Sequence, residues 1–223
     1  ASFCSPFILQ RGDKMGKCVI IGAADIKDYA RAKNYLRKDD FYIFCDAGLK
    51  HNEALGIKPD LIIGDFDSYS KEEALKQGIE TIVLPREKDD TDTVFAVKEG
   101  MRRGFSEFLL LGAIGQRLDH TLGNVSILLM LDEAGRRGMI VDDYSEMSLV
   151  GQTPVYINGS FSYFSVLNIS GKAEGVTIEG AKYPLKDAVI SCDYQYGVSN
   201  EVLAGERAAV SVADGRLLLI KVF

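Results

Sequence analysis

The chain has 223 residues, of which 47% are hydrophobic and 26% charged, a composition typical of a globular protein with its own core. Its net charge of −6 argues against broad contact with nucleic acid, because proteins that bind nucleic acid usually present a basic face. The apolar stretch ILLML at 127–131 is too short to span a bilayer. We therefore expect neither nucleic acid nor a membrane among its partners.

The chain begins with a segment that does not resemble a folded element. FCSPFILQ at 3–10 is too short and too interrupted for a secretory signal, and MGKCVIIGAAD resembles a natural start. We expect residues 1–16 to be a leader or tag outside the fold. Four cysteines are scattered along the chain, and Cys18 and Cys45 fall in apolar runs. This predicts buried packing residues and a reduced, cytoplasmic setting.

From residue 17 to 147, apolar strand-like runs alternate with helix-like segments. The runs are CVIIGA (18–23), FYIFCDA (41–47), DLIIGDFD (60–67), ETIVLP (80–85), EFLLLGA (107–113) and GMIVDD (138–143). The segment DTDTVFAVKEGMRRG has a helical period that places Val94, Val97 and Met101 on one face. Near-continuous apolar strands separated by helices indicate an α/β domain, a doubly wound and mostly parallel sheet covered on both sides.

From residue 148 to 223 the helical period disappears, and short strand-like runs are separated by turn-forming pairs such as Asn158-Gly159. This texture indicates a small all-β domain, an antiparallel sandwich or barrel. The segment ERAAVSVADGRLLLIKVF at 206–223 has the signature of a β-hairpin, because Asp214-Gly215 suits a type I′ turn.

Acidic side chains follow three of the predicted strands. Asp46 comes after YIFC, Asp65 and Asp67 come after LII, and KDDTD (88–92) comes after TIVLP. The carboxyl ends of parallel strands meet at the edge of the sheet where ligands bind, so we expect these carboxylates to converge. Converging carboxylates repel one another without a cation, and their oxygens suit Mg²⁺ bound together with a substrate phosphate.

The KDDTD segment also marks the start of a helix. Asp92 begins that helix, and either Thr91 or Asp90 could cap it; for Asp90 we favour the cap over a ligand role. The fourth strand end is LLLGAIGQRLDHTLGN, in which Gly112 and Gly115 allow a sharp turn. This pattern is neither the dinucleotide fingerprint nor a P-loop.

Arg117 follows this turn at the expected start of the next helix. A guanidinium there is well placed to bind a phosphate with both of its arms, beside backbone N–H groups at the helix end. The alternative is a surface pair of Arg117 with Asp119, with His120 packed inside. For His120, a structural and a functional role are equally compatible with the sequence.

Five ordered motifs resemble those of the thiamine pyrophosphokinase family. They are DAG (46–48), GDFDS (64–68), KDDTD (88–92), RLDHTLGN (117–124) and GVSN (197–200), and the resemblance extends from about residue 17 to the C-terminus. Each motif is modest alone, but the combination is specific. The resemblance implies an α/β domain joined to a β domain, a homodimer, and Mg²⁺-dependent transfer of a pyrophosphoryl group from ATP to the hydroxyl of thiamine, releasing AMP.

The resemblance also implies roles for individual residues. Asp65, Asp67 and Asp92 would bind Mg²⁺, and Asp46 would complete the catalytic set beside the metal and the thiamine hydroxyl. The residues implied in ATP binding are Lys88, Thr91, Arg117, Asp119 and His120. Ser199 and Asn200 would line the thiamine pocket, in an active site shared between the two chains of the dimer.

Two features depart from the family pattern. Gln116 stands where many members have a second glycine, and the chain has no Trp to stack on thiamine, a role that Tyr194 or Tyr196 could take. Two other functions fit parts of the pattern. One is a pyrophosphokinase that acts on a pterin alcohol, against which the β domain with GVSN argues. The other is a thiamine or nucleotide sensor without turnover, which has no need for so many carboxylates near phosphate.

Overall fold

The structure is a computed structural model that describes residues 16–66, 78–87 and 89–223. The predictions made for Asp67, for Lys88 and for residues 1–15 of the leader therefore fall outside the described residues. Within the described ranges, no helix is both long enough and apolar enough to cross a membrane.

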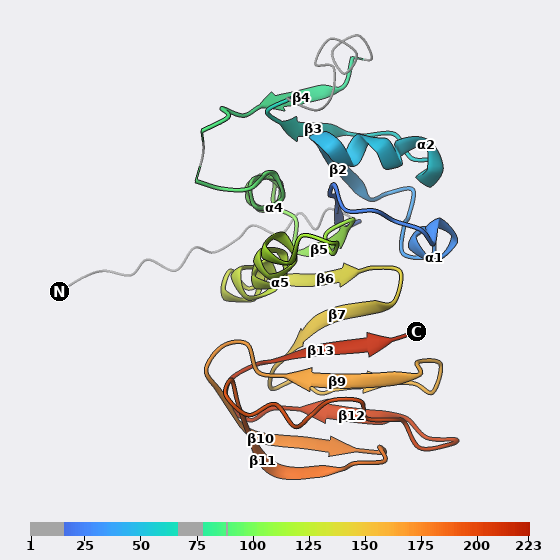
Figure 1. Cartoon of the computed structure of the whole chain (residues 1–223), viewed down its shortest axis with the longest axis vertical. Helices are drawn as coiled ribbons and strands as arrows, with labels where there is room; N and C mark the ends of the chain where they lie inside the picture. Colours follow the sequence, from blue (N-terminus) through green and yellow to red (C-terminus); the bar gives the residue numbers. More distant parts are fainter. Residues whose placement is uncertain (1–15, 67–77, 88) are drawn as a thin grey trace, which may run out of the picture.

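Nine strands form one continuous sheet (Figure 1). In spatial order they are β4 (Glu80–Val83), β3 (Leu61–Gly64), β2 (Phe41–Cys45), β1 (Cys18–Ile21), β5 (Glu107–Leu111), β6 (Arg137–Val141), β7 (Ser145–Val150), β13 (Leu217–Val222) and β9 (Tyr163–Leu167). The first six are parallel, and the last three join them with antiparallel pairing.

Helices cover both faces of the parallel strands. On one face lie α4 (Asp92–Arg102) and α5 (Leu118–Glu133); on the other lie α1 (Tyr29–Lys33), the 3₁₀ helix η1 (Asp46–His51) and α2 (Asn52–Leu55). Side chains alternate along each strand, so Cys18 and Ile20 point to the first face and Val19 and Ile21 to the second. The doubly wound α/β fold is confirmed.

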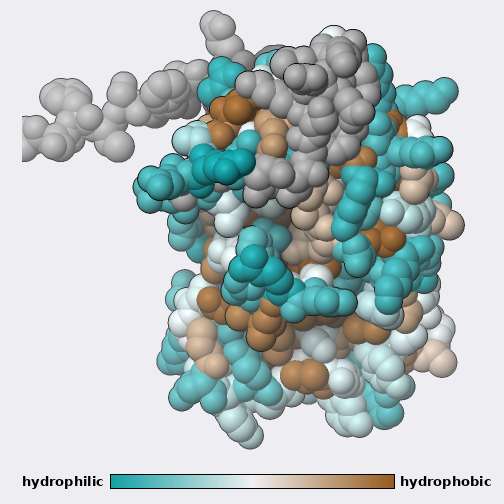
Figure 2. Space-filling model, turned by 45° about the horizontal axis from the view of Figure 1, so that its top comes forward, coloured by the Kyte–Doolittle hydropathy of each residue, from teal (hydrophilic) through white to brown (hydrophobic). Residues whose placement is uncertain are grey.

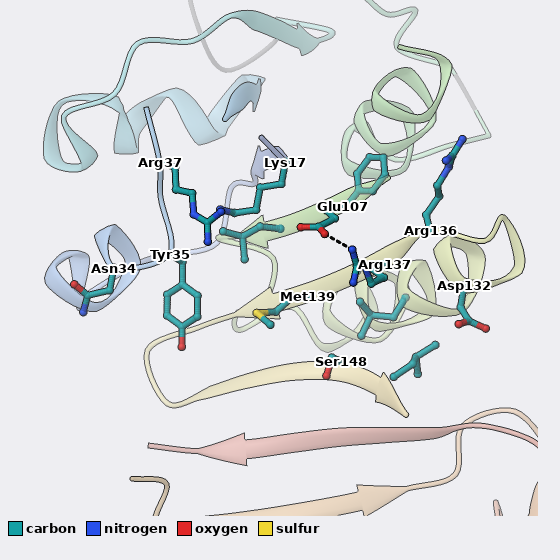
Figure 3. A pocket seen from close by; sticks show the side chains of 15 residues that line it. Lys17, Asn34, Tyr35, Arg37, Glu107, Asp132, Arg136, Arg137, Met139 and Ser148 are labelled. Carbon is teal, nitrogen blue, oxygen red and sulfur yellow. Dashed lines mark hydrogen bonds and ion pairs between the residues drawn. The ribbon is translucent and has the colours of Figure 1, made fainter. Parts of the chain in front are cut away.

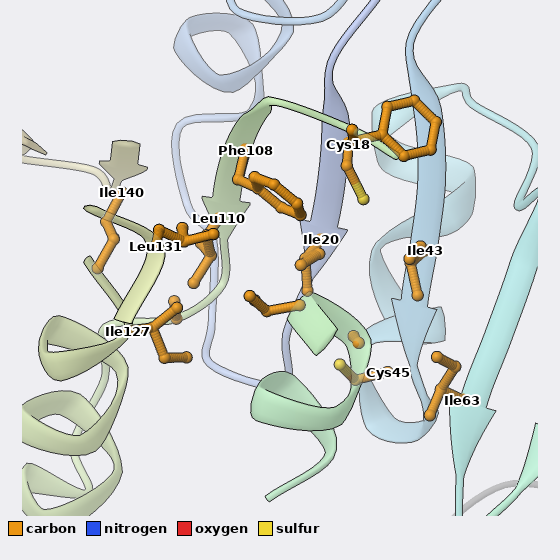
Figure 4. Packing of buried hydrophobic residues seen from close by; sticks show 14 of the residues in the cluster. Cys18, Ile20, Ile43, Cys45, Ile63, Phe108, Leu110, Ile127, Leu131 and Ile140 are labelled. Carbon is orange, nitrogen blue, oxygen red and sulfur yellow. The ribbon is translucent and has the colours of Figure 1, made fainter. Parts of the chain in front are cut away.

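The core beneath α4 and α5 has the composition that the sequence predicts. Figure 4 shows Ile127 and Leu131 of α5 directed at Leu110 of β5. Val97 is fully buried in this core, and Cys18 and Cys45 are buried there as packing residues. These burial predictions are confirmed, whereas the cytoplasmic setting remains a prediction.

The order of the strands places a switch point between β1 and β5. From β1 the chain builds outward through β2, β3 and β4, and it then returns to the other side of β1 to form β5 and β6. In open α/β sheets, ligands bind beyond the carboxyl ends of the strands at such a point. The loops that follow β1 and β5 therefore meet where a ligand site is expected.

The C-terminal half forms the predicted antiparallel sandwich. A four-stranded sheet, β11 (Leu185–Ser191), β10 (Lys172–Glu179), β12 (Ala208–Ser211) and β8 (Val155–Ile157), packs against β7, β13 and β9. One of the two layers is thus the end of the nine-stranded sheet. The loss of the helical period near residue 148 falls inside β7, and the nine-stranded sheet continues across this point.

The hairpin predicted over 206–223 is wrong. β12 pairs with β10 and β8, whereas β13 pairs with β7 and β9. The Asp214-Gly215 turn has the positive φ at glycine that its sequence suggests, 85° at Gly215, but it carries the chain from one layer of the sandwich to the other. Asp214 does not share the positive φ of Gly215, so the predicted type I′ turn is wrong together with the predicted strand pairing.

Candidate active site

Asp46 and Gly64 lie side by side at the carboxyl ends of β2 and β3. Asp46 directly follows β2 and is only 3% exposed. A Cβ atom placed on Gly64 would lie 2.4 Å from the Cβ of Asp46, so only glycine fits there. Asp65 is the next residue and is half-buried. The structure thus brings the DAG and GDFDS motifs together.

The backbone turns sharply within GDFDS. Phe66 has a φ of 57°, in the left-handed region that a bulky residue rarely adopts. Among the described residues, only two other non-glycine residues have a positive φ, Asp187 and Ser199. Ser199 belongs to GVSN. Strained backbone concentrates at functional sites, where the surrounding structure enforces it. Two of the three strained positions therefore fall in motifs assigned to the site.

The start of α4 brings a further acidic residue to this edge. Asp92 is the first residue of the helix and its Oδ1 atom is buried. Thr91 is the N-cap, since its Oγ1 accepts a hydrogen bond from the N–H of Val94 at 3.3 Å. The capping role favoured for Asp90 is wrong, because its carboxylate pairs with Lys98 at 2.5 Å.

The donor set at this edge fits a magnesium ion. Asp46 follows β2, Asp65 follows β3 and Asp92 begins α4, and Mg²⁺ prefers hard oxygen ligands such as their carboxylates. Across 16–66, 78–87 and 89–223, no three His, Cys, Asp or Glu side chains are close enough together to form a metal site by themselves. The predicted ligand set includes Asp67, which lies outside those ranges.

The loop between β5 and α5 is fixed by two side chains of RLDHTLGN. The Oγ1 of Thr121 accepts from the N–H of Gly115 at 3.1 Å and lies 3.2 Å from its carbonyl oxygen. The amide of Asn124 is buried and donates to the carbonyl of Ala113 at 2.7 Å. The sequence did not lead us to predict a role for either residue, although both lie in the RLDHTLGN motif. The signal that could have identified Thr121 and Asn124 is a hydroxyl and an amide side chain in the first two turns of a helix that follows a glycine-containing loop.

Arg117, Asp119 and His120 are exposed at the first turn of α5. Arg117 is the N-cap residue, and its guanidinium contacts the Asp119 carboxylate through Nη2 at 2.5 Å and Nε at 3.3 Å. This pair lowers the pKa of Asp119 to about 2, mainly through the hydrogen bond from Arg117. The surface pair foreseen as an alternative is present, but His120 is exposed and not packed inside.

The two residues of GVSN differ in their surroundings. Ser199 is exposed, and its backbone N–H donates to the hydroxyl of Ser165. Asn200 is 4% exposed, and its amide is used within the chain: Oδ1 accepts from the N–H of Tyr183, and Nδ2 donates to the carbonyl of Tyr183. Asn200 therefore holds the turn that presents Ser199.

Tyr194 and Tyr196, the two candidates to stack on thiamine, lie close to each other near this turn. Their ring centroids are 5.3 Å apart, and both rings are exposed. The hydroxyl of Tyr196 donates to the carbonyl of Val189. Figure 2 shows apolar groups in an interrupted band across the lower half of one face. Several large apolar and aromatic side chains of the C-terminal half are exposed: Tyr163, Tyr183, Val189, Tyr194, Tyr196, Val198 and Leu203.

Within one chain, the acidic edge and the GVSN turn are far apart. Asn200 pairs with Phe164 of β9, whereas Asp46 follows β2. Six strand-to-strand steps separate β2 from β9 in the sheet. At about 4.8 Å a step, this is about 29 Å along the sheet. One chain does not by itself bring its two halves of the predicted site together.

A cavity of about 480 Å³ lies at the opposite edge of the sheet and is not the candidate site. Its lining includes Lys17, Glu107 and Arg137, which stand at the amino ends of β1, β5 and β6. Figure 3 shows the Glu107–Arg137 ion pair across it. Of the residues proposed for catalysis, the three that the structure describes, Asp46, Asp65 and Asp92, do not line this cavity.

Comparison with known proteins assigns the chain to a family. The model of the thiamin pyrophosphokinase catalytic domain matches residues 32–140, and that of the thiamin pyrophosphokinase vitamin B1 binding domain matches 154–217, together well over half of the chain. The thiamine pyrophosphokinase of Bacillus subtilis (strain 168) is 27% identical over 194 residues, which cover 84% of this chain and 89% of that protein.

Solved structures of similar proteins have the same fold. Thiamine pyrophosphokinase from Bacillus subtilis matches with a TM-score of 0.81 at 23% identity, covering 92% of this chain and 98% of that one. Thiamin pyrophosphokinase from Geobacillus thermodenitrificans matches with a TM-score of 0.78 at 27% identity, covering 92% and 97%. The resemblance recognised from the five motifs is thereby confirmed. The chain belongs to the thiamin pyrophosphokinase family.

Proposed function

We propose that this chain transfers a pyrophosphoryl group from ATP to the hydroxyl of thiamine, giving thiamine diphosphate and AMP, with Mg²⁺ required. Family membership makes the chain a thiamine diphosphokinase; the donor, the second product and the metal are the proposed part. The observation that carries the proposal is that Asp46 and Asp65 follow the neighbouring strands β2 and β3, where Asp46 lies against Gly64, and that Asp92 begins α4 after the next strand.

Asp65, Asp67 and Asp92 would hold Mg²⁺ at this edge. When bound, the ion neutralises the crowded phosphate oxygens and so lowers the cost of bringing a nucleophile to them. Asp46, which is buried next to Gly64, would accept a hydrogen bond from the thiamine hydroxyl and orient its oxygen toward the β-phosphorus of ATP. Orientation of this kind is the main contribution that a protein makes to phosphoryl transfer.

The nucleotide would bind along the loops after β4 and β5. Arg117 offers a guanidinium fork for a phosphate, and Asp119 holds that fork in place. The hydroxyl of Thr91 accepts from Val94 and still has a hydrogen to donate to a phosphate oxygen. Lys88 would add a positive charge, and His120, exposed on the same turn, would contact the nucleotide.

Thiamine would bind between two chains of a homodimer. Ser199 would contact it directly, Asn200 would hold the turn, and Tyr194 or Tyr196 would stack on it. The separation of about 29 Å along the sheet supports this arrangement, because a second chain can bring its own GVSN turn to the acidic edge of the first. The exposed aromatic side chains near that turn offer a surface for such an interface.

The test is to measure AMP and thiamine diphosphate after incubation with ATP, thiamine and Mg²⁺. We expect equal amounts of both products, none without thiamine, and none after chelation of the metal. Formation of AMP only when a pterin alcohol replaces thiamine would assign the second function. Tight binding of thiamine or ATP without any AMP would identify a sensor.

A further inference from the structure

His51 lies close to the proposed site but has no role in the reaction as described above. It is the last residue of η1, the helix that Asp46 begins, and it is 2% exposed. Both ring nitrogens are hydrogen-bonded. Nε2 lies 2.9 Å from the carbonyl oxygen of Ala24, and Nδ1 lies 2.7 Å from the hydroxyl of Tyr29. A buried histidine with two bonds to one neighbouring segment is positioned to hold that segment.

The two hydrogen bonds of His51 indicate which ring nitrogen carries the hydrogen. A carbonyl oxygen can only accept, so Nε2 carries the hydrogen and Nδ1 accepts from the hydroxyl of Tyr29. Burial is the main cause that lowers the pKa of His51; Lys50 lowers it further, and the bond to Ala24 and the charge of Asp25 oppose the shift. The neutral ring is the form that makes both bonds with Tyr29 as the donor.

The segment that His51 holds is the loop after β1, which contacts the loop after β5. Beyond the last paired residues of the two strands, the N–H of Gly22 donates to the carbonyl of Leu111 at 2.8 Å, and that of Ala24 donates to Gly112 at 2.9 Å. A Cβ atom on Gly115 would lie 2.8 Å from the Cβ of Ala24, so the two loops are in direct contact. Residues 22–24 are therefore held between His51 and the β5–α5 loop.

The contacts continue into the helix that carries the proposed phosphate ligand. Gly115 is bonded through its N–H to Thr121 in the second turn of α5, and Arg117 is the N-cap of the same helix. We propose that His51 is a positioning residue for the nucleotide: it fixes Ala24 against Gly115 and so sets the β5–α5 loop that receives the phosphates. This inference rests on the proposed function, because that function assigns the loop to ATP.

The consequence is a selective effect on ATP. Loss of one or both bonds of His51 would let residues 22–24 move away from Gly115, and the phosphate-binding loop would lose one of its supports. We expect no direct effect on Ser199, the proposed thiamine contact, because it lies on the other half of the chain. A histidine that only stabilised the fold would change neither Michaelis constant selectively.

The experiment compares three variants at the site with one matched control. Tyr29→Phe removes only the hydroxyl bonded to Nδ1. His51→Leu removes both ring bonds, and His51→Gln keeps an amide that can donate to Ala24. The control is Tyr42→Phe, which also removes one hydroxyl bond, from Tyr42 to the carbonyl of Arg37, but at the amino end of β2.

We expect the KM for ATP to rise about fivefold to tenfold for each bond lost, the scale of one buried hydrogen bond. The KM for thiamine should change less than about twofold, and His51→Gln should recover most of the loss of His51→Leu. Tyr42→Phe should lower the melting temperature without changing the KM for ATP. Calorimetric titration with ATP and Mg²⁺, without thiamine, should show the same loss of affinity.

The inference is overturned if Tyr29→Phe and His51→Leu bind ATP like the wild type, or if every variant at the site shifts both Michaelis constants equally. If His51→Leu does not fold, Tyr29→Phe alone decides the question by the same criterion. Failure of the proposed function would look different. The wild-type protein itself would then make no thiamine diphosphate from ATP, whatever the variants do.

Discussion

A side chain on Gly64 would collide with Asp46: a Cβ atom at position 64 would lie 2.4 Å from the Cβ of that aspartate, closer than two nonbonded carbons approach. The φ of Gly64 is not positive, so the glycine is required by this approach and not by its own backbone angles. The contact places the acidic residue after β2 beside Asp65, which follows β3. The glycine that begins GDFDS thus has a steric cause in the aspartate that begins DAG.

We predict that Gly64→Ala lowers both stability and activity. The added methyl group must push the ends of β2 and β3 apart, which costs about 1–3 kcal/mol in the free energy of unfolding, as overpacking does elsewhere. Urea denaturation and product formation measure the two effects. Gly159→Ala is the control, since a Cβ atom there meets nothing within 4 Å. A Gly64→Ala protein with wild-type stability would show that the two strands separate without cost.

Asp67 tests the proposed magnesium site, because it is one of the three proposed ligands. We predict that Asp67→Asn nearly abolishes turnover and leaves the fold intact, because it removes one charge where negative phosphate oxygens gather. Circular dichroism checks the fold, and an Mg²⁺ titration of the rate checks whether excess metal restores activity. Near-normal activity at ordinary Mg²⁺ concentrations would contradict the assignment of Asp67 as a ligand.

The parts of the fold that depend on local pattern were predictable from the sequence. The parallel strands, the two covered faces and the apolar face of α4 follow from periodicity, because each pattern is contained within about a dozen residues. The partners of β12 and β13 were not predictable in this way. The Asp214-Gly215 sequence is typical of a hairpin turn, but only Gly215 has a positive φ, and the core of the sandwich, built from distant strands, decides which layer each strand joins.

The candidate site shows the same division. The position of the acidic residues at one edge follows from strand order alone, as with Asp46 beside Gly64. Strand order does not show which side chains remain available to bind a ligand. The amide of Asn200 has the chemistry of a ligand, but its bonds to Tyr183 occupy it within the fold. Nothing in the sequence after DAGLK distinguishes His51. Its proposed role follows only from the folded structure, in which Ala24 and Tyr29 form hydrogen bonds with its two ring nitrogens.

Arg117 provides a test of phosphate binding. Arg117→Lys keeps the charge but loses the planar fork that meets Asp119 and a phosphate together. We expect kcat/KM to fall roughly tenfold to a hundredfold, the usual scale for a charge-assisted contact. The control is Arg136→Lys, at the other edge of the sheet. If the Arg117→Lys variant matches the wild type, the pair with Asp119 is only a surface ion pair.

Glu99 makes stability depend on pH. Its carboxylate accepts bonds from Arg102 and Arg103, each at 2.7 Å, and these lower its pKa from 4.5 to about 2, the bond from Arg102 being the largest cause. A folded-state pKa below the unfolded one adds stability above about pH 4.5, and that stability is lost as the pH falls toward 2. Glu99→Gln should therefore destabilise the protein by about 1–3 kcal/mol at pH 7, and the difference should shrink below pH 4.5.

Urea denaturation at a series of pH values measures this difference. Glu107→Gln, which removes a more exposed pair with Arg137, is the control and should cost much less at every pH. A difference for Glu99→Gln that is independent of pH would mean that the glutamate acts through packing and not through its charge.

The last prediction concerns the sharing of the active site between chains. Six strand steps separate β2, which Asp46 follows, from β9, which pairs with Asn200, so we expect each site to combine the acidic edge of one chain with the GVSN turn of another. An Asp65→Asn chain and a Ser199→Trp chain should each be inactive alone, the first without a metal ligand and the second with a blocked thiamine pocket. When the two are mixed and re-equilibrated, half of the dimers are mixed by random pairing, and each mixed dimer has one intact site. About a quarter of the wild-type activity should then return. If the mixture stays inactive while both variants remain folded and dimeric, each chain carries its own complete site, and the two halves meet by a route other than dimerisation.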